Sequence, residues 1–344
     1  MRSADRGAGD ASFAVKARPS LRWARGVRFF RSARATCLTA GALVTLAAGS
    51  ASAYCRSITA DVPAGAQPSG TACYPVGTQG AVLYWAGRCI GWSLQGAPST
   101  KLDLAVAKLR VEAAFSAWSG AACPTGGAPS IAFSDNGPVS CTTIGYVPDR
   151  KNQHVIAFRD GVWPYPGHAS STLALTTLTF NTRTGEIVDG DMEINTAENR
   201  VSTEDVTPLD SYDFQSIVTH EAGHFLGLAH AVSTPATMHA RYSAGETAIR
   251  RLSEDDVAGI CEIYRPSGVR SVSTGVVGSG TVEGRACDAN PLGGFSATCD
   301  ALPPSTPNGG TSRCAYAAPR SEASLAGVMA LAFAWLARAR RRSA

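Results

Sequence analysis

Apolar residues follow two different spacings through the middle of the chain, and each spacing predicts one kind of secondary structure. From about residue 100 to Trp118 they return every third or fourth position, which places them on one face of a helix. The segment 172–180 instead alternates loosely and is rich in Thr and Leu, as a strand is, and 187–194 continues as a second strand after a turn. The middle of the chain therefore combines helices with strands.

Shorter patterns complete the expected elements. Asp210 or Ser211 could cap a second helix that runs through the histidines discussed below, and a last helix runs from about Glu254 to Tyr264, where Pro266 ends it. Short apolar runs predict strands at 82–85, 89–92, 130–133 and 154–158. The residues that we expect in the core of the first helix are Leu104, Ala107, Val111, Ala114, Phe115 and Trp118.

The N-terminal segment 1–53 has the organisation of a secretory signal peptide. Basic residues extend to Arg34, an apolar run covers 37–48, and the small residues Ala51-Ser52-Ala53 precede Tyr54. The alternative, a membrane anchor, needs a run of about 18 apolar residues or more, and this one is shorter. We expect export through signal peptidase, followed by a short N-terminal segment at 54–80.

The C-terminal region consists of a polar, Gly-rich segment followed by an apolar run with a basic end. Residues 267–313 are rich in Gly, Ser, Thr and Pro, which predicts a flexible linker. The tail 314–344 contains an uncharged apolar run at 325–337 that is closed by arginines from Arg338 to Arg342, as in a membrane-engaging segment with its basic flank in the cytoplasm.

Because the net charge of +4 comes from the basic ends, the middle of the chain gives no reason to expect nucleic-acid binding.

Export makes disulfide bonds expected. The chain has ten cysteines, and Cys37 lies in the signal peptide, which leaves an odd number in the mature chain. Cys314, beside the tail, is our candidate for the unpaired one, and Cys55–Cys73 and Cys287–Cys299 are the pairs that we expect from proximity in the sequence. The other mature cysteines are Cys89, Cys123, Cys141 and Cys261.

One segment combines three histidines and a glutamate at the spacing of a metal-binding motif. Residues 220–230 read His-Glu-x-x-His-x-x-Gly-x-x-His. His220 and His224 are four apart, so they share one face of a helix, and Gly227 allows the chain to turn so that His230 can become a third ligand. Three protein ligands leave one coordination position for water, as in catalytic zinc sites, and Glu221 can reach that water as general base. An amphipathic helix with incidental histidines is the alternative, and the length of the motif argues against it.

This motif, followed by Met238, resembles the metzincin signature. The short connection from His230 to Met238, Tyr242 after it, and Leu-Ser-Glu-Asp-Asp at 252–256 are similar to the matrixins, the matrix metalloproteinase catalytic domains. Ala-Phe-Ser-Ala-Trp at 114–118 resembles their first helix. The resemblance covers about 81–266, which we take as the catalytic domain.

The resemblance implies an α+β, zincin-like fold with a twisted, mostly parallel sheet, two main helices and a small C-terminal subdomain with a Met turn at Met238. It implies a monomeric zinc endopeptidase that binds one catalytic Zn²⁺ and cleaves extracellular proteins or peptides. The strand 172–180 would pair with an extended substrate. Leu173, Ala174 and Tyr242 would line the substrate pocket.

The chain departs from the family at the second, structural zinc, because Leu175 and Glu193 stand where matrixins carry histidines. We therefore expect only the catalytic zinc. Asp189, Asp191 and Glu193 alternate on one strand and would face one side, so they are a candidate Ca²⁺ site. A solvated acidic strand end is the alternative.

The tail, with Cys314 before it, resembles the Myxo-CTERM sorting tails of myxobacteria. That resemblance implies C-terminal sorting machinery as a partner, contact with the membrane before or without processing, and a place at the surface of a Gram-negative cell or outside it. Two other functions stay open: a surface-displayed binding module that keeps the metzincin fold, and a narrow-specificity processing protease.

Overall fold

The computed structural model describes residues 54–62, 67–69, 72–96, 99–140, 143–165, 172–232, 235–274, 277–298 and 310–317. The expected signal peptide and the apolar run at 325–337 lie outside these residues. Within the described part, no helix is long and apolar enough to cross a membrane.

Within the described residues, three helices form where the sequence provides both an apolar face and a cap. They are α1 (Leu104–Ser119), α2 (Phe214–Phe225) and α3 (Glu254–Ile263), with a short 3₁₀ turn η1 (Ala248–Arg250). The carboxylate of Asp103 caps α1 by accepting from the backbone N–H of Val106. In α3, the side chains of Ser253 and Asp256 form a reciprocal capping box. The expected core residues of α1 are buried, except Leu104, which is partly buried.

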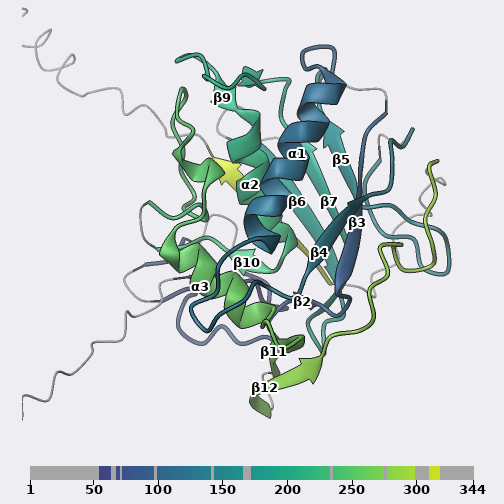
Figure 1. Cartoon of the computed structure of the whole chain (residues 1–344), viewed down its shortest axis with the longest axis vertical. Coiled ribbons are helices and arrows are strands. Elements are labelled where there is room, and N and C mark those ends of the chain that lie inside the picture. Colours follow the sequence, from purple (N-terminus) through teal and green to yellow (C-terminus); the bar gives the residue numbers. More distant parts are fainter. Residues whose placement is uncertain are drawn as a thin grey trace, which may run out of the picture. The chain divides into compact units, whose positions relative to one another are not determined.

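The main sheet has the strand order β13-β6-β7-β5-β3-β4, with β2 beside β7 (Figure 1). Strands β2, β3, β4, β5 and β7 pair in parallel, whereas β6 is antiparallel to both β7 and β13, so the expected mostly parallel sheet is confirmed. The strands of this sheet are β2 (Tyr84–Trp85), β3 (Cys89–Leu94), β4 (Ala132–Asp135), β5 (Val155–Phe158), β6 (Thr172–Phe180), β7 (Glu186–Ile194) and β13 (Gly310–Ala317).

The remaining strands form three small two-stranded sheets. They are β1 (Cys55–Arg56) with β10 (Leu228–Ala229), β8 (Val201–Ser202) with β9 (Tyr212–Asp213), and β11 (Val269–Thr274) with β12 (Val277–Glu283).

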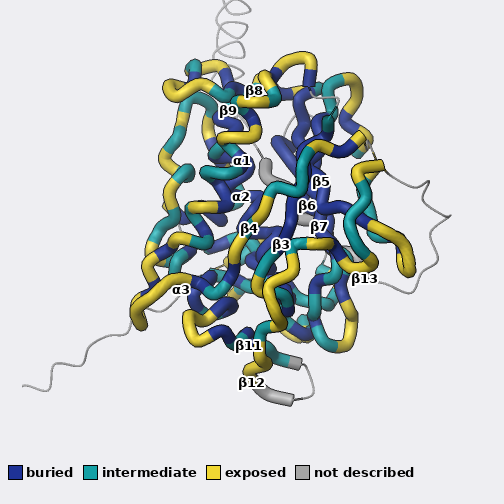
Figure 2. The backbone as a smooth tube through the Cα atoms, turned by 45° about the vertical axis from the view of Figure 1, so that its right-hand side comes forward, coloured by how far each residue is buried: buried dark blue, intermediate teal, exposed yellow. Residues whose placement is uncertain are grey.

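Helices α1 and α2 lie side by side on one face of the sheet, and the buried residues between them and the sheet form the core (Figures 1 and 2). Phe115 of α1 stacks on Phe133 of β4 with ring centroids 4.3 Å apart. Trp118 is fully buried and donates from its indole N–H to the carbonyl of Thr219, which ties α1 to α2. The core therefore holds α2 rigidly against the sheet.

The region after α3, which we expected to be a flexible linker, contains the antiparallel hairpin of β11 and β12. Arg270 of β11 is fully buried, and its guanidinium donates to the carbonyls of Trp85, Gly87 and Ser130. These bonds attach the hairpin to β2 and to the segments before β3 and β4. Sequence composition does not show this, because the partners of Arg270 are more than a hundred residues away.

Three disulfide bonds are present among the described residues. Cys55–Cys73 confirms a predicted pair. The predicted pair Cys287–Cys299 is wrong, because Cys287 is bonded to Cys89 at the start of β3. The third bond joins Cys123 to Cys261 of α3. Cys141 and Cys299 lie outside the described residues.

Candidate metal centre and active site

The cap of α2 sets where its histidines lie. Asp213 accepts from the backbone N–H of Ser216 at 2.8 Å, so Asp213 caps the helix rather than the expected Asp210 or Ser211. Arg250 binds the same carboxylate with two nitrogens, at 2.8 and 2.6 Å. The carboxylate is fully buried, so this two-point contact supplies the charge partner that a buried acid needs.

The chain leaves α2 at Gly227, whose φ of +91° lies in the left-handed region. A Cβ at this position would come within 2.7 Å of the carbonyl oxygen of Leu83, so glycine is required for space as well as for conformation. Strand β10 then pairs with β1, and His230 follows directly. The tight turn therefore brings His230 back towards the helix.

The three histidines form the only metal-ligand cluster found among the described residues, with one ligand atom of each within 4.8 Å of the others. His220 Nδ1 bonds the carbonyl of Thr237 at 2.6 Å, and His224 Nδ1 bonds the carbonyl of Leu228 at 2.9 Å. A carbonyl only accepts, so each Nδ1 carries the proton and each Nε2 keeps a lone pair.

These lone pairs face one another. His220 Nε2 and His224 Nε2 are 3.1 Å apart, and His230 Nε2 is buried without a hydrogen-bond partner. Burial lowers the pKa of His220 and of His230 well below the usual value, and the pKa of His224 to about 4, so protonation does not relieve the contact near neutral pH. The donor set therefore fits a divalent metal ion such as zinc, with the backbone carbonyls orienting the rings.

Glu221 lies beside this cluster and is fully buried. Its Oε2 accepts a hydrogen bond from Thr176 Oγ1 of β6 at 2.5 Å, and its Oε1 has no partner in the described part of the chain. Burial raises the pKa of Glu221 to about 8, because the charged form loses its hydration. A bound cation would favour the carboxylate again.

Met238 packs against Gly223 of α2. A Cβ added at Gly223 would come within 2.2 Å of Met238 Sδ, so the two residues are in close contact. The carboxylate of Asp256 accepts from the backbone N–H groups of Thr237 and Met238, at 2.7 and 3.1 Å. Asp256 of α3 thus holds the segment whose Thr237 carbonyl orients His220.

Comparison with known proteins agrees with this geometry. Residues 84–265 match the family described as Matrixin, and this range is more than half of the chain. The chain belongs to the matrixin family. Members of this family are zinc-dependent metallopeptidases, in agreement with the histidine cluster.

Similarity to individual matrixins is confined to a shorter segment. The chain is 44% identical to stromelysin-1 of Equus caballus over 55 residues, which cover 16% of this chain and 12% of that protein. It is 34% identical to neutrophil collagenase of Homo sapiens over 80 residues, or 23% of this chain and 16% of the collagenase. Metalloendoproteinase 1-MMP of Arabidopsis thaliana is 31% identical over 81 residues, or 23% and 22% of the two chains. The chain thus spans less than a quarter of these relatives.

The residues expected in the substrate pocket of this matrixin lie on two sides of α2. Leu173 and Ala174 are buried on β6, the antiparallel strand that contacts α2. Tyr242 is also buried, and its ring lies 6.2 Å from that of Tyr212, beside the N-terminal end of the same helix.

The three acids of the expected calcium site do lie on one strand, β7, and all are buried, so the solvated alternative is wrong. The structure nevertheless separates them. Glu193 binds Arg159 at 2.5 Å and the hydroxyl of Tyr165, so it has partners of its own. Asp191 accepts from the backbone N–H groups of Gly145 and Val155, whereas neither oxygen of Asp189 has a hydrogen-bond partner among the described residues.

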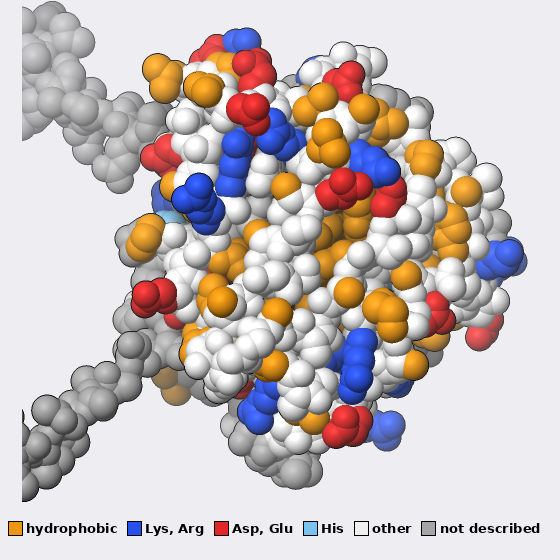
Figure 3. Space-filling view, in the orientation of Figure 1, with side chains coloured by type: hydrophobic (Ala, Val, Ile, Leu, Met, Phe, Trp, Pro, Cys, Tyr) orange, Lys and Arg blue, Asp and Glu red, His pale blue; other side chains and the backbone are white. Residues whose placement is uncertain are grey.

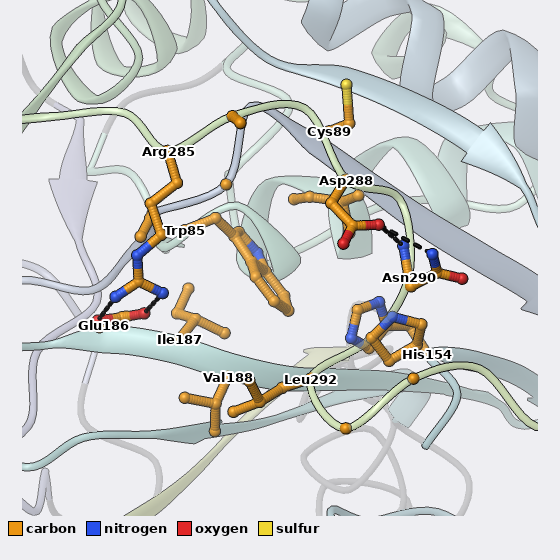
Figure 4. A pocket seen from close by; sticks show the side chains of 17 residues that line it. Trp85, Cys89, His154, Glu186, Ile187, Val188, Arg285, Asp288, Asn290 and Leu292 are labelled. Carbon is orange, nitrogen blue, oxygen red and sulfur yellow. Dashed lines mark hydrogen bonds and ion pairs between the residues drawn. The ribbon is translucent and has the colours of Figure 1, made fainter. Parts of the chain in front are cut away.

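A separate cavity of about 540 Å³ lies at the start of β3 and β7, where the segment 285–294 crosses them (Figure 4). Trp85, Ile187 and Leu292 form apolar walls, and the Arg285–Glu186 ion pair lies at its edge. Residues 285–294 of its lining lie beyond the matched range, and sequence reasoning did not predict this cavity.

Sequence reasoning also missed the residues that support the site. Thr176, Arg250 and Asp256 touch α2 or the residues beside it through contacts that are distant in the chain, whereas Asp213 caps α2 locally. Only Asp256 carried a signal, since it belongs to the Leu-Ser-Glu-Asp-Asp segment that resembles the matrixin closing helix.

Proposed function

We propose that this chain is a zinc endopeptidase in which His220, His224 and His230 hold the metal and Glu221 is the general base. The observation that carries the proposal is the convergence of three neutral imidazoles, the buried His220 and His224 and the partly exposed His230, beside a buried carboxylate. The second zinc of the family is not part of the proposal, because Leu175 and the paired Glu193 stand at its ligand positions.

When bound, zinc lowers the pKa of a water ligand and polarises the scissile carbonyl. Glu221 takes the proton of the attacking water and returns it to the leaving amine. Thr176 occupies one carboxylate oxygen, which leaves Oε1 for this proton transfer. Apolar burial of the site excludes competing water and strengthens these electrostatic contacts.

The substrates that we propose are extended protein or peptide segments. Strand β6 runs antiparallel to β7 beside α2, and a substrate strand would pair with its other edge, which β13 occupies in this structure. Leu173, Ala174 and Tyr242 are proposed to contact the side chains on either side of the cleaved bond. Strand pairing of this kind recognises the backbone of an extended segment more than its side chains. We therefore expect cleavage within chains rather than at their ends.

Export and surface attachment remain part of the proposal. Three disulfide bonds support an oxidising compartment outside the cytoplasm. The signal peptide at 1–53, the Myxo-CTERM-like tail at 314–344 and the machinery that would process them are proposed from the sequence alone. On the face seen in Figure 3, acidic and basic side chains are interspersed, which gives no broad basic surface there.

Calcium is proposed only for Asp189 and Asp191, because Glu193 is paired. Both carboxyls are buried, and the oxygens of Asp189 lack hydrogen-bond donors. If calcium binds there, adding it raises the melting temperature of the parent and leaves that of Asp189→Asn unchanged. An equal effect on both proteins excludes this site.

Metal-dependent proteolysis tests the main proposal. The purified chain is incubated with casein and a peptide library, before and after chelation and zinc re-addition. We expect activity to disappear with the chelator and to return with zinc. Glu221→Gln should bind zinc normally and lose at least about 100-fold in kcat, within the usual range for a general base. Retained activity in this variant excludes the assigned role, and zinc-free protein with full stability favours a binding module.

A further inference from the structure

A segment downstream of the matched range pairs with the edge of β6 that does not face β7. Strand β13, from Gly310 to Ala317, pairs antiparallel with β6 along nearly the whole length of both strands. The register places Gly310 opposite Phe180 and Tyr316 opposite Ala174. The edge that an extended substrate would need is therefore covered by the chain itself.

The register also places β13 beside the catalytic group. Cys314 is opposite Thr176, and Thr176 donates the hydrogen bond to Glu221. Contacts between α2 and β13 show that the strand lies along the catalytic helix as well as along the sheet. The backbone around residue 314 thus runs past the carboxylate that we assign as general base.

We propose that residues 310–317 are a tethered occupant of the substrate cleft, which competes with substrates for the edge of β6. The proposal rests on the proposed function, since it concerns the regulation of the same site. The proposal assigns a role to the segment that precedes the apolar run. As long as residues 310–317 stay attached to the chain, they compete with substrates for the cleft.

Because β13 is part of the same chain as β6, even weak binding between the two strands leads to substantial occupancy of the edge. A segment joined by a short linker has an effective concentration of the order of millimolar at its site. If the free strand bound with a Kd of about 0.2 to 1 mM, the apparent KM for an added peptide would rise roughly two- to six-fold. The kcat would not change, because a saturating substrate displaces the strand.

Proline substitutions test the pairing without removing any part of the chain. Proline has no N–H, and only alternate residues of an antiparallel strand bond to a given neighbour, so two adjacent substitutions are needed. The test variant is Ser312→Pro with Arg313→Pro in the full-length chain. The matched control is Ala301→Pro with Ser305→Pro, in a segment that already contains three prolines before residue 310.

Hydrogen exchange gives a readout that does not depend on catalysis. It is measured on the zinc-loaded chain carrying Glu221→Gln, so that no segment can be cleaved during the experiment. In the parent and the control, we expect protection of the β6 amides on both edges. In the test variant, the amides that face β13 should exchange about two- to six-fold faster, the factor set by the same occupancy of the edge, while those bonded to β7 stay protected. Equal exchange in all three proteins overturns the proposal.

Kinetics with Glu221 restored then tests the competition. We expect a two- to six-fold lower KM for a soluble peptide in the test variant, an unchanged kcat, and competitive inhibition by the peptide Gly-Thr-Ser-Arg-Cys-Ala-Tyr-Ala. An unchanged KM overturns competition even if the exchange result holds. If no protein cleaves any peptide, the proposed function fails, and the exchange data still decide whether the strand occupies the edge.

Discussion

Thr176 and Glu221 are joined by a hydrogen bond of 2.5 Å from the threonine hydroxyl to the carboxylate, although 45 residues separate them in the chain. The bond links strand β6 to helix α2. Both residues are buried, so water cannot replace the threonine hydroxyl without a rearrangement. The orientation of the proposed general base therefore depends on the strand that we also propose to bind the substrate.

Thr176→Val should lower kcat about ten-fold and leave KM nearly unchanged, because the loss of one hydrogen bond of roughly 1 to 1.5 kcal/mol frees the carboxylate to rotate. Thr176→Ser keeps the hydroxyl and should retain most of the activity. Steady-state kinetics with a fluorogenic peptide measures both. A loss of activity that is equal in the two variants would show that packing, rather than the hydrogen bond, is what matters.

Gly223→Ala should lower the stability of the protein and its affinity for zinc. The added Cβ would come within 2.2 Å of Met238 Sδ and 2.8 Å of the Trp118 ring, so Met238 or the helix must shift. Overpacking of this kind costs about 1 to 3 kcal/mol in unfolding free energy. Urea unfolding and the zinc affinity of the variant should both reveal it. Gly161→Ala, where nothing lies within 4 Å of the new Cβ, should leave both unchanged.

Asp189→Asn should stabilise the protein in calcium-free buffer at neutral pH. Burial raises the pKa of Asp189 well above its usual value, with the neighbouring Asp191 adding to the effect, and burial raises the pKa of Asp191 to about 7. Between about pH 4 and 7 the folded state therefore holds protons that the unfolded state has lost, so the stability of the parent falls as the pH rises through this window.

The variant lacks one of these carboxyls, so its stability should fall less between pH 4 and 7. We expect it to exceed the parent by roughly 1 to 3 kcal/mol at pH 7.5 and to match it near pH 4. Chemical denaturation across this range measures the difference. Asp210→Asn, which changes an exposed pair with Arg200, is the control and should not alter the slope. A variant that is less stable than the parent at pH 7.5 contradicts the assignment.

The Cys89–Cys287 bond should contribute more to stability than Cys55–Cys73. Their sequence separations are 198 and 18 residues, and the loss of chain entropy in the unfolded state grows with the closed loop. Replacing both cysteines of a pair by serine should cost about 4 to 5 kcal/mol for the longer loop and about 3 kcal/mol for the shorter one. Thermal unfolding of the two double variants gives the comparison, and the reverse order would show that native-state contacts outweigh loop length.

By itself, the sequence determined those features of this protein whose residues lie close together in the chain. The spacing of His220, His224 and His230 needs only one helix and one turn, and the structure brings these residues together as the spacing predicts. The apolar face of α1 and the short disulfide loop of Cys55–Cys73 were predictable for the same reason. In each case the partners are close enough in the chain for backbone geometry to relate them.

Only the tertiary structure decided the contacts that connect distant segments. Cys287 is bonded to Cys89 rather than to a near neighbour, Arg270 is buried in what composition describes as a linker, and β13 lies along β6 beside the catalytic helix. Composition reports how a segment behaves alone, whereas these contacts form because a sheet edge, a set of backbone carbonyls or a thiol elsewhere in the fold offers a partner. The three candidate metal ligands thus lie in one short motif, whereas the hydrogen bond that orients Glu221 and the pairing of β13 with β6 involve strands that the motif does not contain.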